Sequence, residues 1–235
     1  YMTDNTIKEQ HQHCQCKEDY PLATRLSGEV VHGKKKMQNV KKAISIFGGS
    51  KAKHDSWEYV QTYNLAHELG KRSISVISGG GPGIMEAANK GTKDAKNEIA
   101  KAIGLNIDIM AEINDRQYQD ISIDFEHFAS RKVIFCAHSD AFVIAPGGFG
   151  TLDELFEAIT LMQTEKSPVV PIILMGRNFW EGMMNWVENV MHKEYGLVSQ
   201  KHMELMEIAD DWEDVIRKLE AKKVIFGIYY FNINL

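Results

Sequence analysis

Two glycine-rich turns, at residues 78–83 (SGGGPG) and 146–151 (PGGFGT), constrain this fold more than any other feature of the sequence. Each turn follows an apolar run typical of a β-strand and precedes a helical pattern. Strands and helices that alternate in this way build right-handed βαβ units and a parallel sheet. Because the carboxyl ends of parallel strands meet at one edge, where helix N-termini attract anions, we expect both turns to grip one phosphate-bearing ligand.

The same alternation runs along the chain from residue 40 onward. It predicts an α/β fold in which helices flank a parallel sheet. Residues 107–120 are polar and show little periodicity, which predicts a loop beside the ligand site. The expected strands are residues 43–47, 74–77, 102–106, 122–125, 141–145, 168–174 and 205–208, and the expected helices are residues 56–70, 83–97, 128–139, 151–164, 179–192 and 211–221.

The length and charge of the chain restrict the domain organisation and the class of partner that we expect. A chain of 235 residues fits one large domain, which we place at 40–222, between a flexible N-terminal arm at 1–39, with room for one short helix, and a C-terminal tail at 223–235. The tail is rich in aromatic and β-branched residues, so an edge strand and an interface segment both stay open for it. The net charge of −5, with both signs mixed along the chain, argues against nucleic acid or a membrane surface and favours a small-molecule partner.

The sequence favours a soluble, cytoplasmic protein without structural disulfides. Residues 1–19 lack the apolar core of a signal peptide, and no apolar run approaches the roughly 18 residues that span a bilayer. The three cysteines are too few for a disulfide framework. The histidines and cysteines within residues 11–16 lack the ligand spacing of a zinc site, so we expect no specific metal site.

The first glycine turn has little side-chain bulk and does not match a known nucleotide-binding motif. Its glycines leave little side-chain bulk, which suits a backbone that turns sharply or approaches a ligand closely. The turn spells neither the G-x-G-x-x-G dinucleotide fingerprint nor the G-x-x-x-x-G-K-[ST] phosphate loop. We therefore expect neither a dinucleotide cofactor nor ATP hydrolysis, and an ordinary strand-to-helix turn remains the alternative.

The second turn carries acidic residues as well as glycines. Thr151 and Glu154 have the spacing of a capping box, in which the Thr hydroxyl caps the helix and the Glu returns a hydrogen bond. A phosphate site alone favours fewer negative charges than Asp153, Glu154 and Glu157 bring to one helix N-terminus. A carboxylate aimed at a cationic transition state explains one of them, so both a capping and a catalytic role stay open for Glu154.

Taken together, the motif SGGGPGIMEA, the pair Arg131 and Lys132 and the motif PGGFGTLDE resemble the Lonely guy (LOG) family of cytokinin-activating phosphoribohydrolases, long labelled "possible lysine decarboxylases". The resemblance covers most of residues 40–220. It implies a Rossmann-like doubly wound sheet, a homodimer or larger homo-oligomer, and no cofactor. It also implies a hydrolase that splits a nucleoside 5′-monophosphate into free base and ribose 5-phosphate, with Arg131 and Glu154 as the essential residues.

The chemistry agrees with this assignment, because breaking an N-glycosidic bond builds positive charge on the ribose. We expect Glu154 to stabilise that charge or orient the attacking water, and Arg131 to bind substrate or polarise the departing base. Asp140 is expected to orient Arg131, with a plain turn as the alternative, and Glu157 to support the site. The residues expected to hold substrate and phosphate are Gly79, Gly80, Gly81, Gly83, Lys132, Gly147, Gly148, Phe149, Gly150 and Thr151.

The base and the competing functions stay open at this point. Many family members carry Met-His where this chain has Phe128 and Ala129, so a cytokinin nucleotide and AMP are both candidate substrates. A decarboxylase that uses pyridoxal phosphate is disfavoured, since no lysine stands in a context that singles it out for a Schiff base. A nucleotide-binding or carrier protein of the same fold, without turnover, is the competing function.

Overall fold

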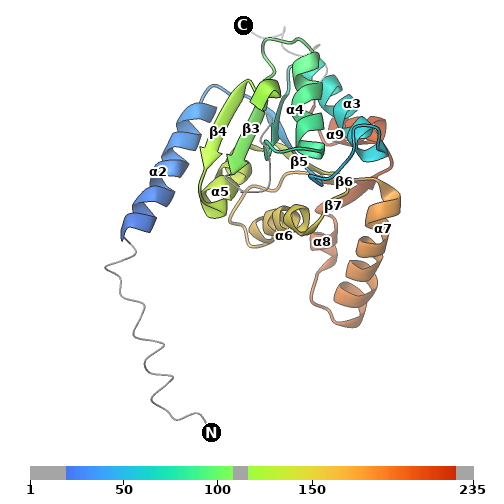
Figure 1. The fold of residues 1–235 in the computed structure, drawn as a ribbon. Helices are drawn as coiled ribbons and strands as arrows, with labels where there is room; N and C mark the ends of the chain where they lie inside the picture. Colours follow the sequence, from blue (N-terminus) through green and yellow to red (C-terminus); the bar gives the residue numbers. More distant parts are fainter. Residues whose placement is uncertain (1–19, 108–115, 226–235) are drawn as a thin grey trace, which may run out of the picture.

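Seven parallel strands form one sheet at the centre of the molecule (Figure 1). The structure is a computed structural model that describes residues 20–107 and 116–225. The strands are β1 (Ala43–Phe47), β2 (Ser75–Ser78), β3 (Ala102–Ile107), β4 (Ile121–Phe125), β5 (Ala141–Ile144), β6 (Ile172–Met175) and β7 (Met206–Ala209). Their order across the sheet is β4-β3-β2-β1-β5-β6-β7, and each neighbouring pair is parallel.

Helices cover both faces of the sheet, so the expected α/β, doubly wound fold is confirmed (Figure 1). Successive side chains of a strand point to opposite faces, and in β1 Ile44 packs with one core cluster while Phe47 packs with the other. One face carries α3 (Trp57–Lys71), α4 (Ile84–Asp94) and α9 (Trp212–Ala221), and the other carries α2 (Tyr20–Met37), α5 (Phe128–His138), α6 (Phe149–Gln163) and α7 (Arg177–Trp186). The short helix α8 (Gln200–Met203) precedes β7.

The strand order places a topological switch beside β1. Strands β2, β3 and β4 extend the sheet on one side of β1, and β5, β6 and β7 extend it on the other. In open α/β sheets, ligands bind in the crevice outside the carboxyl ends of the strands at such a point. The turns that follow β1, β2 and β5 therefore converge where a ligand site is expected.

Residues 20–37 form helix α2, so the expectation of a flexible arm is wrong for this segment. The side of α2 that meets the protein carries Leu26, Val30, Gly33 and Met37, at helical spacing, and Met37 is fully buried. A Cβ on Gly33 would lie 2.7 Å from Cγ1 of Ile134, so glycine lets α2 pack closely on α5. The apolar stripe is narrow and interrupted by glycine, which hid the helix in the sequence pattern. Residues 1–19 lie outside the described part.

Several other boundaries differ from the expected ones. Strand β6 begins at Ile172 rather than at residue 168, because prolines at 168 and 171 have no N–H for the ladder. The expected helix at 179–192 is α7 followed by a π-helical segment, η2 (Val187–Glu194). Most of the expected loop at 107–120 and the tail from residue 226 fall outside the described residues. Among the helices that are described, none combines the length and apolarity that crossing a bilayer requires.

Candidate active site

Three turns, not two, meet at the carboxyl edge of the sheet. The turn after β1, residues 48–50, lies between the two predicted glycine turns and bonds to both. The Gly49 N–H donates to the Pro146 carbonyl at 2.9 Å, and the Ile84 N–H donates to the Gly49 carbonyl at 3.1 Å. The prediction that the two glycine turns come together is thereby confirmed, with the β1 turn as the connection. The signal for it was present in the sequence, because the apolar run 43–47 ends directly on Gly-Gly-Ser.

The first glycine turn packs against the β1 turn through Gly83. This residue has φ +67°, a conformation that favours glycine. A Cβ here would also lie 2.5 Å from the carbonyl oxygen of Gly49. Gly80 has φ +74° and faces Asn106 and Gln119, whose Nε2 donates to the Gly80 carbonyl at 3.2 Å. These contacts give Gly80 and Gly83 structural roles in shaping the turn.

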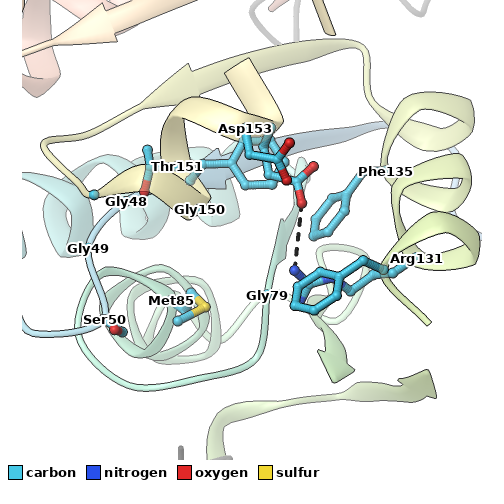
Figure 2. Close-up of a pocket in the computed structure, with 14 residues that line it drawn as sticks. Gly48, Gly49, Ser50, Gly79, Met85, Arg131, Phe135, Gly150, Thr151 and Asp153 are labelled. Atoms are coloured by element: carbon cyan, nitrogen blue, oxygen red, sulfur yellow. Dashed lines mark ion pairs between the residues drawn. The ribbon is translucent and has the colours of Figure 1, made fainter. Parts of the chain in front are cut away.

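The three turns border a cavity of about 280 Å³ (Figure 2). Figure 2 shows Arg131 and Phe135 reaching toward the cavity from α5, opposite Gly150, Thr151 and Asp153 of α6. Of the predicted site residues, Gly79, Arg131, Gly148, Gly150, Thr151 and Glu154 line the cavity. The structure adds Phe47, Gly48, Gly49, Ser50, Met85 and Phe135, together with Phe128 and Asp153. The other predicted residues, Gly80, Gly81, Gly83, Lys132, Asp140, Gly147, Phe149 and Glu157, are not among its lining residues.

Helix α6 begins at Phe149, three residues before the start that a capping box with Thr151 as N-cap requires. Its N-cap is Gly148, which makes no side-chain hydrogen bond, and the Leu152 N–H donates to the Gly148 carbonyl at 3.1 Å. The capping-box interpretation is therefore wrong, and Glu154 lies in the second turn of the helix. Because the first N–H groups of a helix have no intrahelical acceptor, those of residues 149–151 can bind an anion at the cavity.

Arg131 and Glu154 face each other across the cavity from α5 and α6. The Nη2 atom of Arg131 lies 3.6 Å from Oε1 of Glu154, and the two side chains are only 11% and 9% exposed. The Arg131 guanidinium also lies 5.0 Å from the ring centre of Phe128 and 5.8 Å from that of Phe135, within cation–π range. Its Nη1 donates to the Leu105 carbonyl at 3.5 Å. The structure thus brings the two residues predicted to be essential into one ion pair.

The carboxyl of Glu154 is held near the midpoint of its titration at neutral pH. Burial raises its pKa, the charges of Arg131 and Lys132 lower it, and the neighbouring carboxylates Glu157 and Asp153 raise it again, to about 7. Burial dominates because the nearest cation is 3.6 Å away. A carboxyl group with this pKa can both take up and release a proton under physiological conditions, which suits general acid–base chemistry.

Lys132 points away from the cavity, to the outer faces of α5 and α6. Its Nζ lies 2.7 Å from Oδ2 of Asp153 and 2.5 Å from Oε2 of Glu157. Burial lowers the pKa of Lys132, but the hydrogen bonds that it donates to these two carboxylates raise the pKa by more than burial lowers it, so the amine stays charged. The expected phosphate contact of Lys132 is thus replaced by an ion pair that ties α5 to α6. Glu157 is one of the two carboxylates that bind Lys132, and it does not line the cavity.

Asp140 lies at the opposite edge of the sheet, so the expectation that it orients Arg131 is wrong. It immediately precedes β5, whereas the cavity lies at the carboxyl ends of the strands. Its Oδ2 accepts from the Ala43 N–H at 2.9 Å, and its own N–H donates to the Ala43 carbonyl at 2.8 Å. Asp140 therefore joins the starts of β1 and β5, the structural alternative that the sequence left open.

Comparison with known proteins places this geometry in a family. The family model described as "possible lysine decarboxylase" matches residues 85–219. The cytokinin riboside 5′-monophosphate phosphoribohydrolase LOG5 of Arabidopsis thaliana is 26% identical over 78% of this chain and 79% of its own length. A bifunctional cytokinin biosynthesis protein of Fusarium pseudograminearum is 28% identical over 77% of this chain and 40% of its own length.

A solved structure shares the fold. The molybdenum cofactor carrier protein of Chlamydomonas reinhardtii superposes with a TM-score of 0.55 and 21% identity, over 78% of this chain and 98% of the carrier. At this identity the likeness concerns the fold alone. The family-model match extends over more than half of the chain and includes Arg131 and Glu154. The chain therefore belongs to the LOG family, whose family model carries the description "possible lysine decarboxylase".

Proposed function

We propose that this protein hydrolyses the N-glycosidic bond of a nucleoside 5′-monophosphate to free base and ribose 5-phosphate. The observation that carries the proposal is the buried carboxyl of Glu154, with a pKa of about 7, facing Arg131 in a cavity bordered by a helix N-terminus. The names of the Arabidopsis relatives, which are phosphoribohydrolases of a nucleoside monophosphate, support the same reaction class.

The phosphate of the substrate would bind at the start of α6. The N–H groups of residues 149–151 lack intrahelical acceptors, and the helix dipole adds partial positive charge there. Gly148 and Gly150 line the cavity without side chains, so a phosphate can approach the backbone closely. The buried Thr151, also in the lining, adds a hydroxyl donor. This arrangement would place the ribose between the helix start and Glu154, one turn further along.

The reaction would proceed through a cationic ribose. As the bond from C1′ to the base nitrogen breaks, its electron pair leaves with the base and positive charge grows on the sugar. The ionised Glu154 would stabilise this charge and take a proton from the attacking water, whose oxygen bonds to C1′. The proton that Glu154 takes from the water would pass on to the nitrogen of the departing base, which balances the reaction and returns Glu154 to its ionised form, with Arg131 polarising the base or binding the sugar.

The wall of the cavity suits a planar base. Phe47, Met85, Phe128 and Phe135 contribute its apolar side, and Phe128 is half exposed at 49%. Aromatic and thioether side chains pack well against the face of a purine, and such a surface is tolerant of an apolar substituent. We therefore propose a purine monophosphate, either AMP or an adenine nucleotide with an apolar N6 group such as a cytokinin nucleotide.

The decisive test is incubation of the purified protein with purine and pyrimidine 5′-monophosphates, including an isopentenyladenine nucleotide, followed by chromatography for free base. The matching nucleosides without phosphate serve as the control. We expect base release from a purine monophosphate and at least about 100-fold less from its nucleoside, because the nucleoside lacks the phosphate and therefore the binding energy that the phosphate contributes. Binding by calorimetry without release from any nucleotide would overturn the proposal and favour the carrier function.

The pH dependence of turnover follows from the raised pKa of Glu154. If the ionised carboxylate is required, kcat should fall about tenfold for each pH unit below the pKa of about 7 and level off above it. The substrate phosphate also titrates, near pH 6, and measuring kcat at saturating nucleotide limits its effect. A kcat that is constant from pH 5.5 to 8.5, or that falls toward high pH in this range, would contradict the role of the ionised Glu154.

We also propose that the outer faces of α5 and α6 form a homodimer interface. A groove there is lined by apolar side chains, of which Phe149 is 92% and Phe156 40% exposed, and by the polar side chains of Lys132, Asp153, Glu157 and Thr160. Contiguous apolar surface of this kind marks an interaction site, and a two-fold axis would bring the same groove of a second copy against it.

Phe156→Asp should convert the dimer to a monomer at micromolar concentrations, because a carboxylate in an apolar contact loses its hydration. Light scattering coupled to size exclusion measures the mass directly. Val169→Asp is the control, since Val169 is 68% exposed and does not line this groove. A dimer that survives Phe156→Asp, or a monomeric wild-type protein, would contradict the proposed interface.

A further inference from the structure

Glu29 of helix α2 contacts the residues that begin α5, the helix that carries Arg131. We propose that Glu29 is a positioning residue, which fixes the first turn of α5 and thereby sets the place of Arg131 opposite Glu154. The inference rests on the proposed function for its effect on turnover. It concerns a helix outside residues 85–219, the segment that the family model matches.

The carboxylate of Glu29 makes three contacts with the start of α5. Its Oε1 lies 2.9 Å from Nδ1 of His127 and accepts the Glu126 N–H at 3.3 Å. Its Oε2 accepts the Ser130 hydroxyl. The side chain of Glu29 is 15% exposed and that of His127 24% exposed, so water competes little for these bonds. One residue of α2 therefore joins both sides of the α5 N-cap.

Helix α5 has no side-chain cap of its own. Its N-cap, His127, makes no capping hydrogen bond to the helix, so the first turn depends on partners from elsewhere. A carboxylate beside a helix N-terminus is favoured by the helix dipole. Burial raises the pKa of Glu29, but the hydrogen bonds from Ser130, His127 and Glu126 lower it by more. The net pKa is therefore lowered, which keeps the carboxylate ionised at neutral pH. Glu29 thus holds the residues on both sides of the α5 N-cap through the Glu126 N–H and the side chains of His127 and Ser130, rather than through the first N–H groups of the helix.

The anchored turn carries the residues that hold the catalytic guanidinium. The carbonyl of His127 accepts both the Ser130 hydroxyl at 2.9 Å and the Arg131 N–H at 3.3 Å. Phe128, whose ring centre lies 5.0 Å from the guanidinium, occupies the same turn. A shift of this turn would move Arg131 and Phe128 together relative to Glu154, which sits on a different helix. Misplacement by about 1 Å can lower an enzyme rate about 100-fold.

The packing of the rest of α2 against the protein holds the backbone of Glu29 in place. Met37 is fully buried in the core, and Gly33 lets the helix lie directly on Ile134 of α5. Arg25 makes a further contact from α2 to the segment that precedes α5, with Nη1 at 3.5 Å from Oε2 of Glu126, but both side chains are exposed. Arg25 touches the outside of the same junction without contacting His127 or Ser130, and it therefore provides a matched control.

The test compares Glu29→Ala, Glu29→Gln and Arg25→Ala in the full-length protein. Steady-state kinetics with the preferred nucleotide give kcat and KM, and hydrogen exchange with mass spectrometry follows the amides of residues 126–135. We expect Glu29→Ala to lower kcat between tenfold and 100-fold with KM changed less than about threefold. Exchange in the first turn of α5 should accelerate about tenfold, because that turn opens locally. Glu29→Gln, which retains acceptor oxygen, should recover part of both effects.

Arg25→Ala should match the wild-type protein in kcat and in exchange. The proposal is overturned if Glu29→Ala leaves kcat and exchange unchanged, if Arg25→Ala loses as much, or if exchange rises throughout the protein rather than in α5. If wild-type protein releases no base from any nucleotide while Glu29→Ala still loosens only the α5 turn, the proposed function fails and the positioning of Arg131 by Glu29 stands.

Discussion

Glu154→Gln is expected to lower kcat for base release by about a thousandfold while nucleotide binding persists. Glutamine has the size and shape of glutamate, so the cavity lining and the α6 N-terminus stay in place. It carries no charge at any pH, and it can neither stabilise a cationic ribose nor take a proton from water. Because the effect concerns the transition state, KM and the dissociation constant should change far less than kcat.

Single-turnover chromatography for free base and calorimetry with the same nucleotide measure the two quantities separately. Glu181→Gln is the matched control, because Glu181 is exposed on α7 and lies outside the cavity lining. Its kcat should stay within about twofold of wild type. A Glu154→Gln variant that keeps more than a tenth of the wild-type kcat would show that the carboxylate has no catalytic role.

The sequence predicted the sheet well because each strand, and each helix that directly connects two strands near the site, follows its own local signal. Apolar runs such as 141–145 and the helical pattern at 128–139 recur in alternation, and βαβ units leave few topologies open. Strand β5 and helix α5 accordingly lie within one residue of the expected bounds. The narrow stripe on α2 gave no comparable signal, since its stability depends on packing against α5 rather than on propensity.

The sequence named Arg131 and Glu154 as candidate site residues but did not predict their geometry. Arg131 and Glu154 lie on separate helices, and only the fold places them 3.6 Å apart. The capping-box pattern at Thr151 is local and plausible, but α6 starts three residues earlier than that pattern requires, at Phe149, and leaves Glu154 free to face the cavity. Asp140 was expected near the site because it precedes the strand that leads to the second glycine turn, and Lys132 because it adjoins Arg131. The structure instead places Asp140 at the start of that strand, bonded to Ala43, and pairs Lys132 with Asp153.

The raised pKa of Glu154 is likewise a product of tertiary structure. Its value depends on burial between α5 and α6, and on a balance between two cations and two neighbouring carboxylates. Lys132 is neutralised locally by Asp153 and Glu157, which leaves Arg131 as the cation that faces Glu154 directly across the cavity. Changes to Arg131 should therefore alter both the chemistry and the titration of Glu154.

Arg131→Lys is expected to lower kcat about 100-fold, even though the charge is retained. The planar guanidinium lies near the rings of Phe128 and Phe135 and reaches Glu154 from there, whereas an ammonium group has neither the flat face nor the fixed fork. Arg131→Ala removes the charge as well, so it should lower kcat further. Arg217→Lys, at a side chain 73% exposed on α9, is the control and should leave kcat unchanged.

The pH profile distinguishes loss of a contact from loss of charge. Since the charge of Arg131 lowers the pKa of Glu154, its removal in Arg131→Ala should move the rise of kcat to higher pH than in wild type. Arg131→Lys, which keeps a cation nearby, should shift the profile less. Wild-type kcat in Arg131→Lys would contradict a role for the guanidinium geometry, and an unmoved profile in Arg131→Ala would contradict the coupling to Glu154. A shift together with a lower kcat would mean that one ion pair sets both the protonation of the carboxylate and the rate of bond cleavage.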